Sequence, residues 1–105
     1  MIDYEKLKKD IKYLLRNDFS GHDFEHTLRV YHNAILISKS VIGADKDVIK
    51  ISALLHDIAY SKKFFSGEHG DISAELAEPI VEGLELSGKQ KQMILQAITL
   101  HNFFT

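Results

Sequence analysis

Lys46-Asp-Val-Ile-Lys-Ile-Ser-Ala-Leu-Leu-His-Asp-Ile58 is the stretch that decides how this chain folds. Its apolar residues occupy more than one face of a helix, a pattern typical of a central helix that packs on several sides. Two ionisable residues, His56 and Asp57, follow the apolar run directly. Because an unpaired imidazole or carboxylate is costly to bury, the pair needs a partner nearby. A divalent cation would satisfy both side chains.

A second interpretation of this pair needs no metal. At the end of a helix, His56 can interact with the helix dipole while Asp57 caps the next turn. Adjacent helical residues diverge by about 100°, so both side chains reach one ion only if it lies beside the helix end. The pair alone leaves both interpretations open.

Length and composition bound the class of protein. A chain of 105 residues predicts one domain, spanning residues 1–105, with a single core. The net charge of −2, with basic residues mixed among acidic ones, argues against a nucleic-acid surface. The absence of cysteine excludes disulfides and thiolate metal sites. Any metal ion must therefore be held by imidazole and carboxylate groups.

The N-terminal sequence and the apolar runs bear on location. Met1–Lys6 lacks the basic and apolar regions of a signal peptide. No apolar run approaches the roughly 18 residues that a membrane span requires. We therefore expect a cytoplasmic protein that does not span a membrane.

The hydrophobic periodicity is helical throughout, and strand-like alternation never persists. The predicted fold class is all-α, a single compact bundle of about five helices. We expect helices over about residues 3–17, 22–40, 46–58, 69–84 and 88–101. The predicted helix starts are N-caps at Asp3 and Asp45 and capping boxes at Ser20–Asp23 and Ser87–Gln90. Gly43 is predicted to stop the second helix, and Pro79 to bend the fourth.

The second predicted helix carries polar residues that core packing does not explain. His22, His26, Arg29 and Asn33 are spaced by four, three and four residues, so they form one stripe. Exposed histidines are common, and two of them one turn apart can arise by chance. The stripe gains weight only beside the other histidines of the chain.

Two further histidines lie at predicted helix ends. His69 begins the fourth helix, and a loop histidine in solvent is its plain alternative. His101 ends the fifth helix on an otherwise apolar face, where a core histidine with one backbone hydrogen bond would suffice. Together with His26 and His56, however, they suit a metal site assembled within a helical bundle.

Imidazole and carboxylate donors favour Mn, Fe, Co, Ni, Zn or Mg over copper(I) or iron–sulfur clusters. A bound ion of this kind lowers the pKa of water and neutralises oxyanions. Phosphoester hydrolysis is the chemistry that such an ion serves most naturally. The guanidinium of Arg29 is suited to binding phosphate oxygens.

These motifs resemble those of the HD superfamily of metal-dependent phosphohydrolases, in its predicted-phosphohydrolase branch. The matching segments are HDFEHTLRV at residues 22–30, ALLHDI at 53–58, EHGDISA at 68–74 and AITLH at 97–101. The resemblance covers nearly the whole chain from Gly21 onward.

The resemblance implies roles for the individual histidines. It implies that a divalent metal ion is bound by His26, His56 and Asp57. It implies that His69 and His101 help to hold a second metal ion. In our functional hypothesis, which joins the resemblance to the set of ligands, His69 and His101 bind a second metal ion or the substrate, and His22 and Arg29 contact the phosphate of the substrate. The resemblance implies no organic cofactor.

The family pattern also includes a further aspartate well downstream, whereas this chain ends at Thr105. We therefore expect either a C-terminally shortened member or another group in that position. Phe103 and Phe104 suggest either an apolar surface covered in a homodimer or a frayed terminus.

The resulting functional hypothesis is a phosphohydrolase that acts on a small phosphorylated substrate, a nucleotide or another phosphate ester, through metal-activated water. The alternative is a non-catalytic HD-like module that binds metal or a nucleotide, or mediates dimerisation.

Overall fold

The computed structural model describes residues 2–17, 23–62 and 69–101, with only the backbone of His69. Its elements are α1 (Tyr4–Leu14), α2 (Phe24–Ser38), α3 (Lys46–Leu55), the 3₁₀ turn η1 (Ile58–Ser61), α4 (His69–Glu82) and α5 (Gly88–Leu100). No strand occurs within the described ranges, so the predicted all-α fold with five α-helices is confirmed there. His22, Ser20, Phe103 and Phe104 lie outside them.

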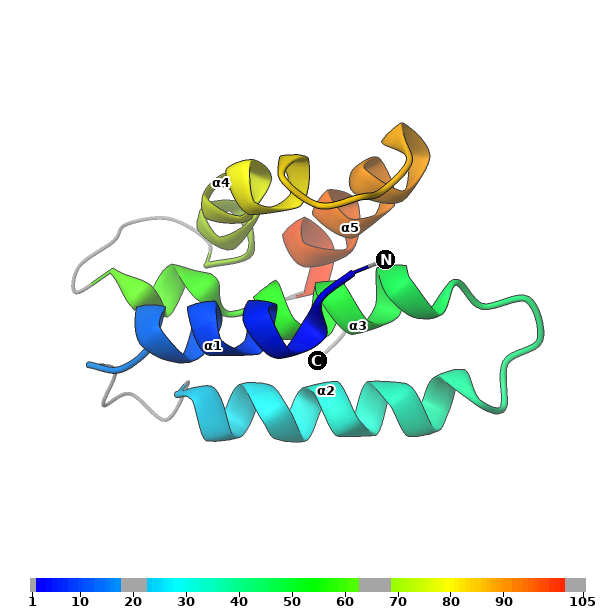
Figure 1. Ribbon diagram of the computed structural model, residues 1–105, viewed down its shortest axis with the longest axis horizontal. Helices are drawn as coiled ribbons and strands as arrows, with labels where there is room; N and C mark the ends of the chain where they lie inside the picture. The colour runs from blue at the N-terminus through cyan, green and yellow to red at the C-terminus, as the bar shows by residue number, and fades with distance from the viewer. Residues whose placement is uncertain (1, 18–22, 63–68, 102–105) are drawn as a thin grey trace.

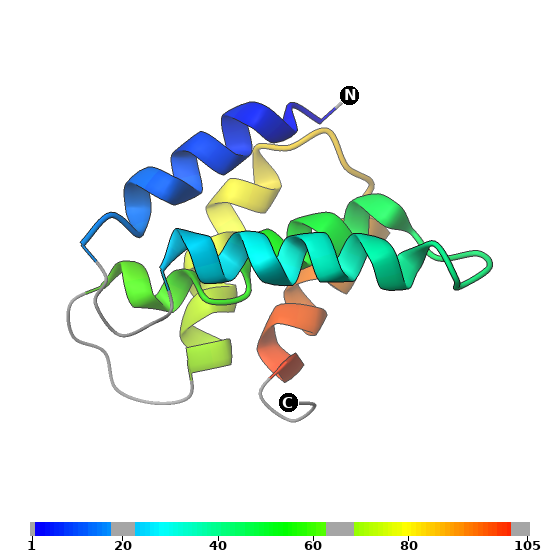
Figure 2. The same cartoon turned by 90° about the horizontal axis from the view of Figure 1, so that it is seen from below.

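Helix α3 is the centre of the bundle, as its sequence predicts. It contacts α1, α2, α4 and α5. Figure 1 shows α2 running alongside α3, with α4 and α5 packed together above them, and Figure 2 shows α1 along one side. The fully buried large side chains of the core are Ile11, Ile51, Leu54, Leu55, Ile58, Val81, Ile94 and Ile98. Three of these eight come from α3 itself.

The predicted helix signals are largely confirmed. The carboxylates of Asp3 and Asp45 accept hydrogen bonds from the backbone N–H groups of Lys6 and Val48. The Ser87 box with its glutamine partner begins α5. Gly43 has the expected left-handed conformation, with a φ of 81°, but it does not stop the helix as predicted, because α2 ends at Ser38 and Gly43 lies in the connection to α3.

Helix α2 begins later than predicted, because Asp23 is its N-cap. The Asp23 carboxylate accepts a hydrogen bond from the N–H of His26 at 3.0 Å. The cap fixes the first turn of α2, and therefore the backbone from which His26 projects.

Helix α3 ends at Leu55, three residues before the predicted end at Ile58. His56 is its C-cap, and the backbone then turns at Asp57 (φ −113°, ψ 22°) into η1. The N–H of Tyr60 donates to the carbonyl of Asp57, which stabilises the new turn. Pro79 lies inside α4 as predicted, and α4 ends at Glu82 rather than Leu84.

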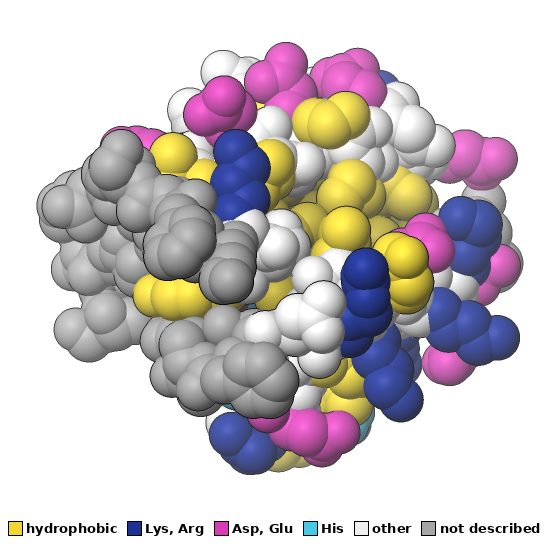
Figure 3. All heavy atoms as spheres, turned by 90° about the vertical axis from the view of Figure 1, so that its left-hand side faces the viewer, with side chains coloured by type: hydrophobic (Ala, Val, Ile, Leu, Met, Phe, Trp, Pro, Cys, Tyr) yellow, Lys and Arg dark blue, Asp and Glu magenta, His cyan; other side chains and the backbone are white. Residues whose placement is uncertain are grey.

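The surface seen from one end of the bundle carries charges of both signs. In the part of this face that is coloured by type, Lys and Arg side chains and Asp and Glu side chains both occur, with apolar side chains exposed between them (Figure 3). Within the described ranges, no helix combines the length and the apolar character needed to cross a bilayer.

Candidate metal centre

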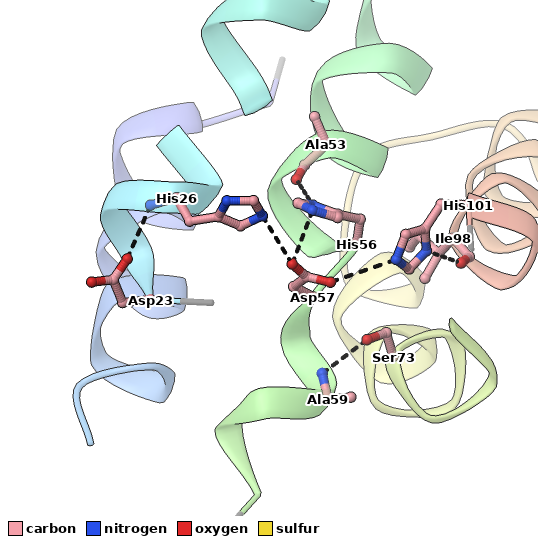
Figure 4. A network of polar contacts seen from close by, with 9 residues as sticks. All are labelled: Asp23, His26, Ala53, His56, Asp57, Ala59, Ser73, Ile98 and His101. Atoms are coloured by element: carbon pink, nitrogen blue, oxygen red, sulfur yellow. Dashed lines mark hydrogen bonds and ion pairs between the residues drawn. The ribbon is translucent and has the colours of Figure 1, made fainter. Parts of the chain in front are cut away.

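Asp57 is the hub of a buried polar cluster (Figure 4). Its side chain is 3% exposed, and its Oδ2 atom lies 3.1 Å from Nε2 of both His26 and His56. Its Oδ1 atom lies 3.5 Å from Nε2 of His101. The carboxylate makes no capping hydrogen bond to η1. The interpretation of Asp57 as a capping residue for the next turn is therefore wrong.

Each histidine of the cluster comes from a different helix end. His26 lies in the first turn of α2, whereas His56 and His101 are the C-caps of α3 and α5. The early end of α3 directs Asp57 to the point where these three ends meet. A cluster drawn from residues 26 to 101 therefore depends on the whole bundle rather than on one local motif.

Backbone carbonyls fix the orientation of two imidazoles. Nδ1 of His56 donates to the Ala53 carbonyl at 2.6 Å, and Nδ1 of His101 donates to the Ile98 carbonyl at 2.5 Å. A carbonyl oxygen only accepts, so Nδ1 carries the hydrogen in both rings. In the neutral imidazole, Nε2 then presents a lone pair to the Asp57 carboxylate.

Two lone pairs facing each other repel, and a positive charge between them removes the conflict. That charge is a second proton on the imidazole or a metal ion. The pKa of His101 shows the pull of this carboxylate. Burial acts to lower that pKa, but the Asp57 contact, the Ile98 carbonyl and the Asp57 charge outweigh it and raise the pKa.

The donor geometry fits a divalent cation. The ligand atoms of His26, His56 and Asp57 all lie within 4.8 Å of one another. Two donors that each lie about 2.1 Å from an ion are at most about 4.2 Å apart, so small side-chain movements suffice for binding. The His26 side chain is 30% exposed, which leaves one side of the site accessible from solvent.

The remaining predicted residues divide into two groups. His101 joins the cluster through Asp57, and its ring lies 5.2 Å from that of His56, centroid to centroid. Arg29 is exposed, and among the described contacts none brings it to Asp57. It projects about 60° around α2 from His26, on the same solvent-facing flank. His22 and the side chain of His69 lie outside the described residues, so their roles stay predictions.

Ser73 supports the site, a role that the sequence did not reveal. It is fully buried on α4, and its hydroxyl oxygen accepts a hydrogen bond from the N–H of Ala59 at 2.9 Å. This bond ties η1 to α4 two residues after Asp57. A serine within a helix is too common to mark such a contact in sequence.

Gly70 is the second supporting residue that the sequence did not reveal. A Cβ at Gly70 would lie 2.6 Å from the backbone oxygen of Thr99 and 3.1 Å from that of Ile98. Only glycine therefore allows α4 to approach α5 this closely. The Ile98 oxygen is the acceptor that orients His101, so the packing of Gly70 bears on the cluster.

Helices converging on a His–Asp doublet define the class of this protein. The HD domain family model matches residues 23–105, and the chain belongs to the HD domain family. That family is generally one of metal-dependent phosphohydrolases.

A relative gives the chain a wider context. It is similar to an uncharacterized protein from Clostridium beijerinckii, with 30% identity over 97 residues. The match covers 90% of this chain and 62% of that protein, so the chain spans less than two thirds of its relative. No solved structure matches significantly.

Proposed function

We propose that this chain is a metal-dependent phosphohydrolase acting on a nucleotide or another small phosphate ester. The observation that carries the proposal is the polar cluster at the HD doublet, which is the pair His56 and Asp57. In this cluster, Nε2 of His26 and Nε2 of His56 each lie 3.1 Å from Oδ2 of Asp57. Membership of the HD family supports the same class of chemistry.

In this proposal His26, His56 and Asp57 hold the cation. Bound there, a divalent ion supplies activated water and charge neutralisation for the phosphoryl oxygens. Asp57 provides the negative charge among the three donors, which favours a cation over a neutral ligand. His101 holds the second carboxylate oxygen and so positions Asp57, although it retains the alternative role of binding a second ion or substrate.

The open flank beside His26 is where substrate would approach. Arg29 lies on this flank and is exposed, so its guanidinium is free to bind a phosphate oxygen. His22 is predicted to act beside it, and His69 to bind a second ion or the substrate. The test of these assignments is kinetic, since loss of a phosphate contact raises KM while the metal content stays unchanged.

The proposal is tested with purified chain supplied with Mn, Fe, Co, Ni, Zn or Mg. Generic phosphomonoesters and nucleotides serve as substrates, with phosphate and pyrophosphate release as the readout. We expect release that depends on one or more of these metals and is lost in Asp57→Asn. Glu78→Gln, which alters an exposed carboxylate of α4, is the matched control and should retain it. Folded protein without metal-dependent release would refute the catalytic proposal.

A non-catalytic metal-binding module is the second candidate, and the size of the donor set favours it. Among the described residues the set holds two imidazoles and one carboxylate. Three protein ligands can retain an ion without completing an active centre. Stoichiometric metal that disappears in the His56→Ala, Asp57→Ala double variant, without turnover by the wild type, would support this candidate. Unchanged metal content and melting temperature in that variant would refute both.

Three further expectations stay predictions: a single domain over residues 1–105, a cytoplasmic location and a homodimer. The oligomeric state follows directly from light scattering on the purified chain. A nucleotide as substrate also remains a proposal, because the relative that the chain matches is uncharacterized.

A further inference from the structure

A groove between α1 and α2 is the second concave feature that we consider. It has a volume of about 340 Å³. Its walls come from one stripe of each helix, comprising Glu5, Lys8, Lys9 and Lys12 of α1 and Phe24, Leu28 and His32 of α2. The groove exists because α1 packs mainly on α3 and η1 rather than on α2. Its volume lies within the range of small-molecule sites.

The groove is separate from the metal centre. On a helix, Leu28 projects about 160° away from His26, so the two residues lie on opposite flanks of α2. Between these flanks, the buried Thr27 and Tyr31 face the core. A ligand in the groove therefore has no direct path to Asp57, and the inference does not depend on the proposed function.

The walls of the groove combine an apolar floor with a basic rim. Phe24 and Leu28 form the floor, while three lysines and one glutamate lie along α1. Lys8 is held in place, with Nζ 4.8 Å from the centroid of the Tyr31 ring and 3.4 Å from Oε1 of Glu5. Among the described residues, no ion pair occupies Lys9 or Lys12. The rim therefore carries positive charge that is available to a ligand.

The side chains that line the groove favour an anion with an alkyl chain over a nucleotide. A nucleotide base presents amide-like donors and acceptors, and these need matching partners when they are buried. Phe24 and Leu28 offer such a base no hydrogen-bond partner, because the polar side chains of the described lining are the three lysines, Glu5 and His32, and all of these but Lys8 are exposed. An alkyl chain needs no such partners and gains from contact with Phe24 and Leu28. A single anionic head then reaches Lys9 and Lys12 at the rim.

We infer that the α1–α2 groove binds an amphiphilic anion, a medium-chain fatty carboxylate, with its chain on Phe24 and Leu28 and its head at Lys9 and Lys12. The preference for a carboxylate head over an uncharged one follows from the charge of the rim. The preference for an alkyl body over a base follows from the apolar contact that Phe24 and Leu28 offer, because the polar side chains of the lining lie mainly at the exposed rim.

Binding is tested by titrating decanoate, below its micelle concentration, into the ¹⁵N-labelled chain. We expect saturable chemical-shift changes in α1 and α2 around Leu28, with little change around Asp57. Decanol and decyltrimethylammonium, which lack the negative head, should bind at least about tenfold more weakly. Equal binding of decanol would overturn the role of the lysines.

Two matched double variants each replace two lysines by glutamate, one pair in the groove and the other pair outside it. Lys9→Glu with Lys12→Glu should weaken decanoate binding about tenfold or more, because the head then meets two negative charges. Lys39→Glu with Lys89→Glu changes the net charge equally at exposed positions outside the groove and should leave binding unchanged. Melting temperatures establish that both variants fold.

Besides equal binding of decanol, three outcomes would overturn the inference. The first is equal weakening by both charge-reversal pairs, which would mark a general charge effect. The second is tighter binding of AMP than of decanoate in the groove, which would mark a nucleotide site. The third is a set of shifts centred on the exposed apolar residues Leu36, Ile37 and Ile42 rather than on the groove.

Discussion

The two ends of the α2–α3 pair differ in which side chains they bury: one end buries a charged side chain, and the other exposes an apolar one. At one end, Asp57 is 3% exposed and lies among three imidazoles. At the other end, where the chain passes from α2 to α3, Ile42 is fully exposed. A buried charge must be matched by partners, whereas an exposed apolar side chain loses little by facing water. The first end should therefore tolerate substitution poorly and the second end well.

The largest effect is expected at Asp57 in the presence of metal. A cation at about 1,000 times its dissociation constant adds about 4.1 kcal/mol to the free energy of unfolding. Asp57→Asn removes the negative donor, so the melting temperature should no longer rise when metal is added. Thermal unfolding with metal and with chelator measures this difference for each protein.

Glu78→Gln is the control, because it removes an exposed carboxylate of α4 instead. It should keep the metal-dependent rise in melting temperature. If Asp57→Asn retained the same rise as the wild type, Asp57 would not be a ligand.

The next largest effect is expected where α4 meets α5. Gly70→Ala brings a methyl group to about the position that lies 2.6 Å from the Thr99 oxygen, so the helices must separate. Such overpacking against backbone costs about 3 kcal/mol. Denaturant unfolding measures the loss, and the His101 ring resonances should shift because the Ile98 carbonyl moves.

Gly88 provides the matched glycine. A Cβ there meets nothing within 4 Å, at the start of α5. Gly88→Ala should therefore change stability by less than about 1 kcal/mol, and in the stabilising direction. Equal losses in both glycine variants would show that helix packing is not what Gly70 provides.

A smaller effect is expected at Ser73. Ser73→Ala leaves the N–H of Ala59 without its hydroxyl acceptor in a buried setting, which costs about 2 kcal/mol. The Ser52 hydroxyl is also buried but has no hydrogen-bond partner among the described residues. Ser52→Ala should therefore cost much less, or stabilise the protein. Comparing the unfolding free energies of these two variants isolates the hydrogen bond from the loss of a hydroxyl.

The sequence predicted those parts of the molecule that depend on local chemistry. Asp45 and Ser87 are caps because their side chains bond backbone groups only three residues away. The central position of α3 followed from apolar residues on several faces, since such a helix has to be covered. The HD doublet likewise stands out because two polar residues follow that apolar run.

Long-range geometry was beyond the reach of the sequence. Nothing local indicates that Gly70 must approach Thr99, or that Ser73 accepts from Ala59. The end of α3 at Leu55 was also missed, because the apolar pattern continues through Ile58 into η1. That error matters for the site, since the early end of α3 is what turns Asp57 toward His26 and His101.

The smallest effect is expected at the exposed end of the α2–α3 pair. Ile42→Ser removes an apolar side chain that is fully exposed, so no packing is lost. The free energy of unfolding should change by no more than about 0.5 kcal/mol, as for surface substitutions in general. A loss above about 1 kcal/mol in dilute solution would mean that Ile42 is buried there. If, in addition, the melting temperature rose with protein concentration for the wild type alone, a second copy of the chain would be what buries Ile42. The contrast between the two ends would then be one between a polar site and an interface, rather than between a constrained and a free surface.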